Sequence, residues 1–216
     1  MSGREAPACP VCRGLDVRHF GRIEEKSYWR CEACLATFLD PVARLSAEAE
    51  KQVYLEHEND PHDPGYRRFL SKLADPLCTR LPEAAEILDY GCGPGPALAD
   101  LLREAGHLVR LYDPFFHADE SSLEPGYDAV TCTEVVEHFH DPAREFAYLG
   151  GLLRPGGWLA IMTCFQTEDA RFANWHYRRD PTHVVFYREE TLKLLAERHG
   201  WCCEIPGKDV ALMQVP

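Results

Sequence analysis

Two groups of residues have the types and spacing that chemistry requires, and the first is a set of four cysteines. Cys9-x-x-Cys12 and Cys31-x-x-Cys34 are separated by residues 13–30. Two such pairs at this separation are typical of a tetrathiolate zinc site. Four thiolates complete a tetrahedron and leave no open position for catalysis, so a structural zinc is predicted. A unit of about 40 residues buries little core and needs such a cross-link.

The second group is a glycine loop, DYGCGPG at residues 89–95. Its glycines allow a sharp turn and a close approach of the backbone to a ligand. At the carboxyl edge of an α/β sheet, such a loop is where nucleotide-like ligands bind. Asp113 ends the next predicted strand, where a carboxylate can accept hydrogen bonds from ribose hydroxyls. The spacing Gly-x-Gly-x-Gly differs from that of dinucleotide enzymes, which disfavours a nicotinamide-dependent oxidoreductase.

Alternating strands and helices are predicted to position this loop. From residue 86 onwards, short apolar segments alternate with segments of helical period. This pattern predicts an α/β fold with a doubly wound, mostly parallel sheet that two final strands close. Strands are predicted at 86–90, 108–112, 127–133, 157–163, 201–205 and 209–214, and helices at 96–105, 142–153 and 188–199.

The chain divides into three predicted parts. Residues 1–40 form a small zinc ribbon, which ends at Asp40-Pro41 because proline keeps the residue before it out of helical geometry. Residues 41–81 form a helical connector, for which Ser46 is a candidate N-cap. Residues 82–216 form the α/β domain.

Composition and charge exclude some classes of function. The chain has 216 residues and a formal net charge of -12, which disfavours nucleic acid because that affinity comes largely from Lys and Arg. The ribbon is near neutral, with seven Lys and Arg against six Asp and Glu over residues 1–45. No apolar run reaches the ~18–20 residues that span a bilayer. The first residues lack the apolar core of a secretory signal. A cytoplasmic protein without membrane contact is therefore expected.

Four segments carry a resemblance to a known family. LDYGCGPG (88–95) resembles motif I of the class I S-adenosylmethionine-dependent methyltransferases, and LYDP (111–114) resembles the acidic end of their second strand. YDAVTCTEVVEHFHDP (127–142) resembles their fourth strand and the following loop. LLRPGGWLAIMT (152–163) resembles their turn into the fifth strand. The resemblance implies a Rossmann-like methyltransferase fold, and the likeness is greatest to quinone-biosynthesis O-methyltransferases.

The resemblance implies a set of cofactor-binding residues, with one departure from the family pattern. Only residues 114–126 separate Asp113 from the next strand, which leaves at most a vestige of the usual helix and third strand. The adenine-binding residues therefore stay unassigned, with Phe115 or Phe116 as candidates for stacking. The stretch 54–66 is expected to fold over the cofactor. The implied S-adenosylmethionine-binding residues are Asp89, Gly91, Cys92, Gly93, Gly95, Asp113, Pro114 and Glu134.

The methyl acceptor is expected over the ends of the fourth and fifth strands, as in the family. Two loops lie there, 134–141 and the long stretch 164–187. Long ordered loops are often functional. The alternative reading is structural: hydrogen-bonded histidines, and a capped, solvated loop for Glu134, Glu137 and His138. The same groups could also hold a metal, and Arg178-Arg179 could neutralise an anionic acceptor. The candidates for acceptor binding or general base are His183 first, then His176, Asp180 and His138, with His140 facing them.

These observations predict an S-adenosylmethionine-dependent methyltransferase that acts on a small molecule, with O-methylation as the default. Two alternatives remain. One is methylation of RNA or protein, with the ribbon as a docking module. The other is a non-catalytic module that binds S-adenosylmethionine for regulation. The sequence does not identify the acceptor, its reacting atom, the role of the ribbon beyond structure, or the oligomeric state.

Overall fold

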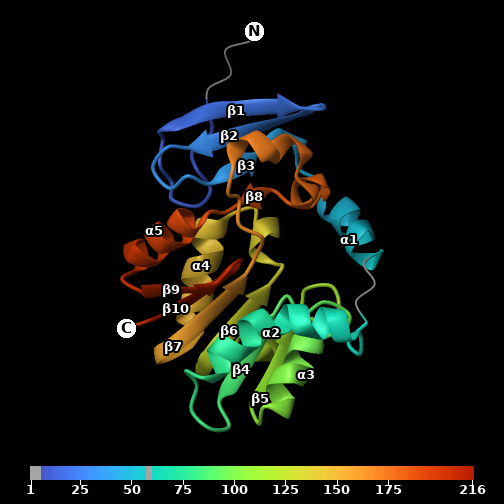
Figure 1. Cartoon of the computed structure of the whole chain (residues 1–216), viewed down its shortest axis with the longest axis vertical. Helices are drawn as coiled ribbons and strands as arrows, with labels where there is room; N and C mark the ends of the chain where they lie inside the picture. Colours follow the sequence, from blue (N-terminus) through green and yellow to red (C-terminus); the bar gives the residue numbers. More distant parts are fainter. Residues whose placement is uncertain (1–5, 57–59) are drawn as a thin grey trace.

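A six-stranded sheet forms the centre of the protein, whose structure, a computed structural model, describes residues 6–56 and 60–216 (Figure 1). The strand order is β5-β4-β6-β7-β10-β9. The four strands β5, β4, β6 and β7 run parallel to one another. β10 is antiparallel to its neighbour β7, and β9 is antiparallel to β10, so the predicted closing pair of strands is confirmed. The strands are β4 (Glu86–Tyr90), β5 (Leu108–Tyr112), β6 (Tyr127–Thr133), β7 (Leu153–Met162), β9 (Cys202–Gly207) and β10 (Val210–Gln214).

Helices cover both faces of this sheet because the central strands are apolar on both sides. Ile87 and Ala129 lie in one buried cluster with side chains of α2 and α3, whereas Leu88 and Val130 lie in a second cluster with side chains of α4 and α5. Neighbouring residues of a strand point to opposite faces, which explains this alternation. The doubly wound α/β fold predicted from the sequence is confirmed. The helices are α1 (Ala47–Leu55), α2 (Pro64–Cys78), α3 (Ala97–Glu104), α4 (Pro142–Gly151) and α5 (Glu189–His199).

Short polar side chains set where several helices begin. Ser46 accepts a hydrogen bond from the Ala49 N–H, as predicted for the N-cap of α1. The Asp63 carboxylate accepts from the Tyr66 N–H, and Pro64 occupies the first position of α2. This cap and the proline explain why α2 starts at Pro64, within the predicted helical connector.

The sheet ends at β5, as the short stretch after Asp113 predicts. All residues between Asp113 and Tyr127 are described, and their only helix or strand is a 3-10 turn, Glu120–Leu123. The Tyr127 hydroxyl donates to the Ser122 carbonyl oxygen at 2.7 Å and fastens this turn to the sheet. The third-strand region is therefore reduced to a turn, and β5 is left as an edge strand.

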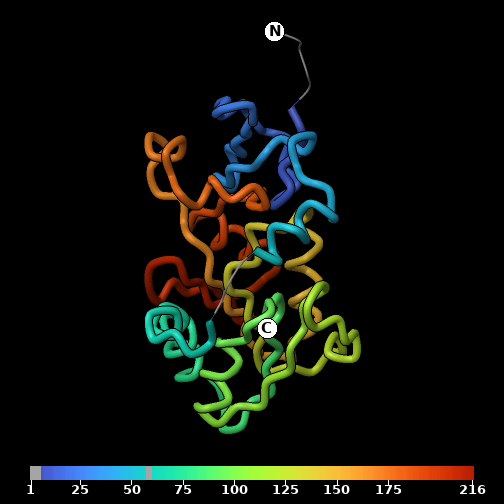
Figure 2. The backbone as a smooth tube through the Cα atoms, turned by 90° about the vertical axis from the view of Figure 1, so that its right-hand side faces the viewer, coloured from blue at the N-terminus to red at the C-terminus, as the bar shows by residue number. Residues whose placement is uncertain are grey.

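The N-terminal region builds a second, antiparallel sheet that sequence reasoning did not foresee in full. Strands β1 (Val17–Ile23), β2 (Lys26–Cys31) and β3 (Thr37–Leu39) pair in order, and β3 then pairs with β8 (Val185–Phe186). The strand β8 comes from the long stretch 164–187, so two segments far apart in sequence share one sheet (Figure 1). The N-terminal strands lie above the central sheet along the long axis (Figure 1), and the backbone seen from the side shows the N-terminal segment at the same end (Figure 2). The predicted boundaries at 40 and 81 remain a prediction, and residues 1–5 lie outside the described chain.

Among the described residues, no helix combines the length and apolar character that crossing a bilayer requires.

Candidate active site

A cavity of about 940 Å³ opens at the carboxyl ends of β4, β5 and β6. The glycine loop forms one wall, and the loop after β6 together with the segment 176–183 forms the opposite wall. Of the predicted site residues, every cofactor-binding and acceptor candidate lines it: Asp89, Gly91, Cys92, Gly93, Gly95, Asp113, Pro114, Glu134, His138, His176, Asp180 and His183. The topology therefore brings both predicted groups to one cavity. Their roles in binding and catalysis stay predictions.

The glycine loop touches the opposite wall at Gly91. Gly91 and Gly93 have φ angles of +77° and +64°, in the left-handed region that favours glycine. A Cβ atom on Gly91 would lie 2.5 Å from Cγ2 of Val135, whereas a Cβ atom on Gly93 would meet nothing within 4 Å. Gly91 is therefore needed for close packing between the two walls. Gly93 leaves open space beside the cavity.

Two carboxylates lie at the cofactor end of the cavity. Burial raises the pKa of Asp89 to about 6, and the Thr131 hydroxyl donates to it at 2.8 Å. The Asp113 carboxylate accepts three backbone hydrogen bonds. One oxygen accepts from the Gly93 N–H, and the other accepts from the N–H groups of Phe115 and Phe116. Three of about four acceptor positions are thus filled, which leaves one for a ribose hydroxyl.

Glu134 and Thr133 meet the cavity where β6 ends. Glu134 has a φ angle of +53°, a strained conformation for a residue with a side chain. Burial, and then the charge of Glu137, raise its pKa to about 9. The hydroxyl of Thr133 is buried without a hydrogen-bond partner in the described protein. An unpaired polar atom on a cavity wall is the position where a ligand group fits. This orphan hydroxyl and the glycine cradle suit a compact polar cofactor.

Two imidazoles on the acceptor side are held in one tautomer. Nδ1 of His183 lies 2.7 Å from the Tyr177 carbonyl oxygen, and Nδ1 of His138 lies 3.1 Å from that of Thr182. A carbonyl oxygen only accepts, so each Nδ1 carries the hydrogen. In the neutral rings the lone pairs are therefore on Nε2. Burial lowers the pKa of His138, which favours that neutral form.

The two Nε2 atoms converge on Glu137, a carboxylate with no exposed surface. Each Nε2 lies 3.9 Å from Oε1 of Glu137, beyond hydrogen-bond distance. Glu137 itself accepts hydrogen bonds from the hydroxyls of Tyr177 at 2.5 Å and Thr163 at 3.0 Å. Burial raises the pKa of Tyr177 well above its usual value, so Tyr177 stays a donor. Glu137 thus lies behind the acceptor wall, which is the wall formed by the loop after β6 and residues 176–183, and it holds the hydroxyls of Tyr177 and Thr163 in place.

The remaining acceptor candidates differ in burial. The Asp180 carboxylate accepts from the N–H and hydroxyl of Thr182, and these bonds lower its pKa although burial opposes ionisation. His176 is exposed at the cavity edge. Arg178 is buried and donates to the Tyr28 hydroxyl at 3.3 Å and to the Ala173 carbonyl oxygen at 3.0 Å. Arg178 therefore has structural partners, and Arg179 is the exposed member of the pair.

Helix α1 covers the cavity with its last residues. The Tyr54 ring lies 5.6 Å from that of Phe115 and 5.3 Å from that of His138, so it spans the cofactor and acceptor sides. A 2.7 Å contact between Glu50 and Nε2 of His140 fastens α1 to the loop after β6. Tyr66, at the other end of the expected lid, also lines the cavity. Residues 57–59 of that stretch lie outside the described chain.

Two clusters among the described residues offer ligand atoms to a metal. The first consists of the Sγ atoms of Cys9, Cys12, Cys31 and Cys34, all buried and within 4.8 Å of one another. Zn–S bonds of about 2.3 Å would place tetrahedral sulfurs about 3.8 Å apart, so this cluster fits a closed zinc site. Arg13 and Leu35, each directly after a cysteine pair, share φ angles near +60° and give the two loops the same turn.

The second cluster consists of Glu137, His138 and His183, whose ligand atoms also lie within 4.8 Å. Two imidazoles and a carboxylate form a donor set for a divalent cation. Each Nδ1–H is tied to a carbonyl oxygen, which is the usual support of a ligating histidine. The same Nε2 atoms can therefore accept a proton or hold a cation.

Comparison with known proteins assigns the family. A family model described as a methyltransferase domain matches residues 37–204, most of the chain. This chain belongs to the S-adenosylmethionine-dependent methyltransferases. The methyltransferase fold, and the resemblance on which the sequence analysis relied, are thereby confirmed. The match begins inside the predicted ribbon, at the first residue of β3.

Individual relatives are similar to part of this methyltransferase. It is 35% identical over 109 residues to a ubiquinone biosynthesis O-methyltransferase of Thiobacillus denitrificans, covering 39% of this chain and 47% of that protein. It is 34% identical over 110 residues to an uncharacterized methyltransferase of Mycobacterium tuberculosis, covering 42% of this chain and 55% of that protein. The chain thus spans about half the length of the curated relatives it matches.

A solved structure shows the same fold. It is the magnesium protoporphyrin IX methyltransferase of Synechocystis PCC 6803, with bound SAH. The TM-score is 0.51 at 15% sequence identity, and the match covers 79% of this chain and 95% of that one.

Sequence reasoning missed two residues of the cavity wall and one residue behind it. The solvated loop expected for Glu137 is wrong, because this residue is fully buried beneath both imidazoles. Tyr177 and the Thr133 hydroxyl were not singled out. The signal available for Glu137 was its position next to His138, on a loop directly after a buried strand. Tyr177 had no such signal, because its partner is 40 residues away.

Proposed function

We propose that this protein transfers the methyl group of S-adenosylmethionine to a hydroxyl oxygen of a small molecule. The observation that carries the proposal is the fixed tautomer of His183: its Nδ1–H is bonded to the Tyr177 carbonyl oxygen, so Nε2 is available on the acceptor wall. A hydroxyl acceptor must lose a proton, which such a nitrogen can take.

The chemistry follows from which residues face the reacting atoms. When bound, S-adenosylmethionine supplies an electrophilic methyl group. The acceptor oxygen would take this methyl group as its bond to sulfur breaks, with the electron pair of that bond remaining on S-adenosylhomocysteine. His183 accepts the hydroxyl proton on Nε2. Glu137, 3.9 Å away, stabilises the imidazolium that results. The protein otherwise contributes orientation, because this is an in-line displacement.

The shape and charge of the cavity favour a small acceptor. A cavity of about 940 Å³ is at the upper end of the usual range for small-molecule sites, which suits a cofactor together with a modest second ligand. Tyr54 of α1 covers the space between the two walls. The net charge of -12 disfavours nucleic acid. The curated relatives named O-methyltransferases support oxygen as the accepting atom.

The test measures methyl transfer from labelled S-adenosylmethionine to three sets of acceptors: phenols and catechols, amines, and bulk RNA or protein. We expect turnover with hydroxylated aromatics only. Turnover with RNA or protein, or with amines alone, would contradict the proposal, as would the absence of S-adenosylmethionine binding. Dialysis against a mild chelator that leaves the cysteine-bound zinc in place, as checked by metal analysis, and then addition of single divalent cations separates the two uses of the Nε2 atoms. A proton acceptor works without a cation, whereas a cation site requires one.

A further inference from the structure

We propose that the ribbon, residues 6–40, is the scaffold of the acceptor wall, so that a metal held by its four cysteines controls the acceptor site and leaves the cofactor site intact. The inference rests on the proposed function for the identity of the acceptor wall. The acceptor segment is defined as residues 164–187. Its backbone, side chains and packing all depend on the ribbon.

The first link is a continuous run of backbone pairing. Phe38 and Thr37 of β3 pair with Val185 and Phe186 of β8, so the acceptor segment completes the ribbon sheet. The Leu39 N–H donates to the Val184 carbonyl oxygen at 2.8 Å. The Val184 N–H in turn donates to the Glu137 carbonyl oxygen at 2.9 Å. His183 directly precedes Val184, the last residue of this run.

The second link is an ion pair between a buried arginine of β2 and an exposed carboxylate of the acceptor segment. Arg30 is 3% exposed, and its guanidinium contacts Oδ1 of Asp169 at 2.6 Å. Its Nε also donates to the Thr37 hydroxyl at 2.9 Å. Arg188, at the far end of the segment, contacts the same Asp169 oxygen. The Asp169 carboxylate therefore links β2 to the start of the acceptor segment and to Arg188, directly after its end. Without this carboxylate the buried guanidinium of Arg30 loses its counter-charge.

The third link is aromatic packing. Phe172 of the acceptor segment is buried between rings from both sides, with centroids 5.2 Å from Phe20, 5.1 Å from Tyr28 and 5.0 Å from Phe186. All three contacts are edge-on, the favoured arrangement for aromatic pairs. Tyr28 also accepts the hydrogen bond from Arg178. The strands β1 and β2 thus supply the surface on which the segment folds.

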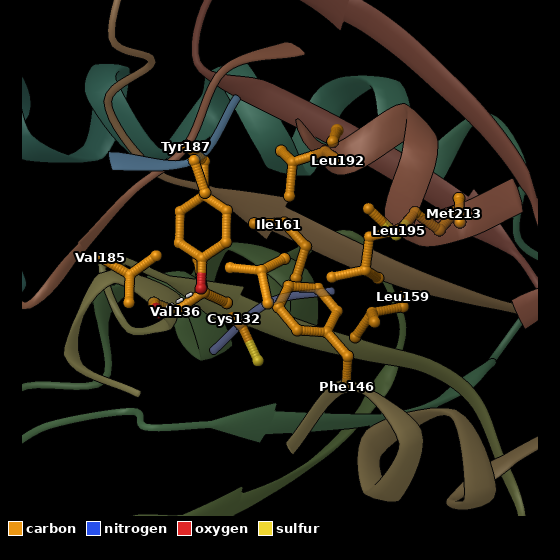
Figure 3. Close-up of a cluster of buried hydrophobic side chains, with 14 of the residues drawn as sticks. Cys132, Val136, Phe146, Leu159, Ile161, Val185, Tyr187, Leu192, Leu195 and Met213 are labelled. Atoms are coloured by element: carbon orange, nitrogen blue, oxygen red, sulfur yellow. Dashed lines mark hydrogen bonds between the residues drawn. The ribbon is translucent and has the colours of Figure 1, made fainter. Parts of the chain in front are cut away.

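The acceptor segment is also anchored in the methyltransferase core. Figure 3 shows Val185 and Tyr187 among side chains of α4, α5 and β7, with the Tyr187 hydroxyl bonded to the Val136 carbonyl oxygen at 2.9 Å. This contact fixes the start of the turn that carries Glu137 and His138. The acceptor wall is therefore held between two anchors, the core on one side and the ribbon on the other.

The cofactor wall has its own packing. The cluster formed by α2 and α3 with β4, β6, β7 and β10 contains no ribbon residue within the described chain. In Figure 1 these helices lie at the opposite end of the molecule from the ribbon. The four cysteines, by contrast, belong to the same buried cluster as Val185, Phe186 and Tyr187. Loss of the metal should therefore loosen the acceptor wall first.

Hydrogen exchange on the full-length protein tests this asymmetry without any acceptor. The zinc is removed with a strong chelator, without a thiol reagent because Cys92 lines the cavity, and its release is quantified. We expect amides of residues 176–187 to lose at least about tenfold in protection, while those of β4 and β6 stay within about threefold. The affinity for S-adenosylmethionine should also stay within about threefold. Because these readouts need no acceptor, they remain decisive if the proposed acceptor chemistry is wrong.

Two results would overturn the inference. Equal loss of protection in β4, with loss of S-adenosylmethionine binding, would make the metal a requirement of the whole fold. Unchanged exchange in residues 176–187 would make the ribbon independent of the acceptor wall.

A metal-retaining variant repeats the test without chemical treatment. Asp169→Asn weakens the bond from β2 to the acceptor segment and leaves the cysteines untouched. The control is Arg171→Met, because Arg171 lies in the same turn and its ion pair with Glu168 is exposed. We expect Asp169→Asn to keep full zinc content, to speed exchange at residues 176–187 at least about fivefold and to raise the acceptor KM. Equal behaviour of the two variants would contradict the second link.

Discussion

The two walls of the cavity are built in different ways. The cofactor wall comes from nearly consecutive elements: β4, its glycine loop, α3 and the end of β5 lie within residues 86–113. The acceptor wall assembles the loop after β6, the segment 164–187 and a strand of the ribbon. A wall made of neighbours in sequence depends on local backbone geometry. A wall made of distant segments depends on what holds them together, here the ribbon sheet and the buried Glu137.

The walls also differ in charge. The cofactor side presents the carboxylates of Asp89 and Asp113, and Glu134, also a cofactor-binding candidate, lies at the start of the loop after β6. Burial raises the pKa of Asp89 to about 6 and that of Glu134 to about 9, which suits a site that receives a cation. A sulfonium and an ammonium group would stabilise their ionised forms. The acceptor side presents imidazoles in fixed tautomers, which suits proton transfer. The comparison can be tested by changes that affect one wall, the other, or the contact between them.

The largest effect is expected at the contact itself. Gly91→Ala would combine a strained φ angle with a Cβ atom 2.5 Å from Val135. We expect a loss of about 2–4 kcal/mol in unfolding free energy and weak S-adenosylmethionine binding. Gly93→Ala is the matched control, since it has the same backbone penalty in open space, and should cost about 1 kcal/mol. Chemical denaturation measures both. Equal costs would show that the walls do not touch closely.

The next effect concerns the acceptor wall alone. His183→Ala should lower kcat about 100-fold, in the range typical of a lost general base, and leave S-adenosylmethionine affinity within about twofold. His62→Ala, at an exposed histidine, is the control. Steady-state kinetics and calorimetry together decide the outcome. A loss of cofactor affinity equal to the loss of turnover would make His183 a structural residue.

A smaller effect is expected at the cofactor wall. Asp113→Ala should weaken S-adenosylmethionine binding at least about tenfold, because it removes a ribose acceptor and the bond from the Gly93 N–H. Asp119→Ala is the control, since Asp119 caps the following turn in a similar way and is exposed. Calorimetry measures both. Equal affinities would remove Asp113 from the cofactor site.

The last expected effect is a pH dependence of stability. The pKa of Glu134 lies at about 9 in the folded protein, against 4.5 ordinarily, because of burial and then the charge of Glu137. The folded state therefore holds a proton that the unfolded chain releases between those values, so stability falls as pH rises from about 4.5 to 9. Glu134→Gln should flatten this slope, with a difference on the order of 1–3 kcal/mol near pH 9. Denaturation at several pH values, with Glu124→Gln as an exposed control, checks it. If the unfolding free energy depends on pH with the same slope in the wild-type protein and in Glu134→Gln, the raised pKa of Glu134 is contradicted.

The sequence by itself determined the cofactor wall and the cysteine cluster. The glycine loop, Asp113 and the cysteine pairs are recognisable because their geometry is set by residues close together in the chain, through turns, strand ends and short loops. The shortened edge after β5 could also be predicted, because 13 residues cannot hold a helix and a strand.

Only the tertiary structure decided the acceptor wall. No spacing in the sequence indicates that β8 completes the ribbon sheet, that Arg30 meets Asp169, or that Glu137 lies under both imidazoles. Apart from the contact between Glu137 and its neighbour His138, these contacts join residues between 46 and 149 positions apart, and a two-residue strand has no periodicity to recognise. Burial and the need of backbone groups for hydrogen bonds select the partners of these residues. Both conditions arise only when the chain has folded.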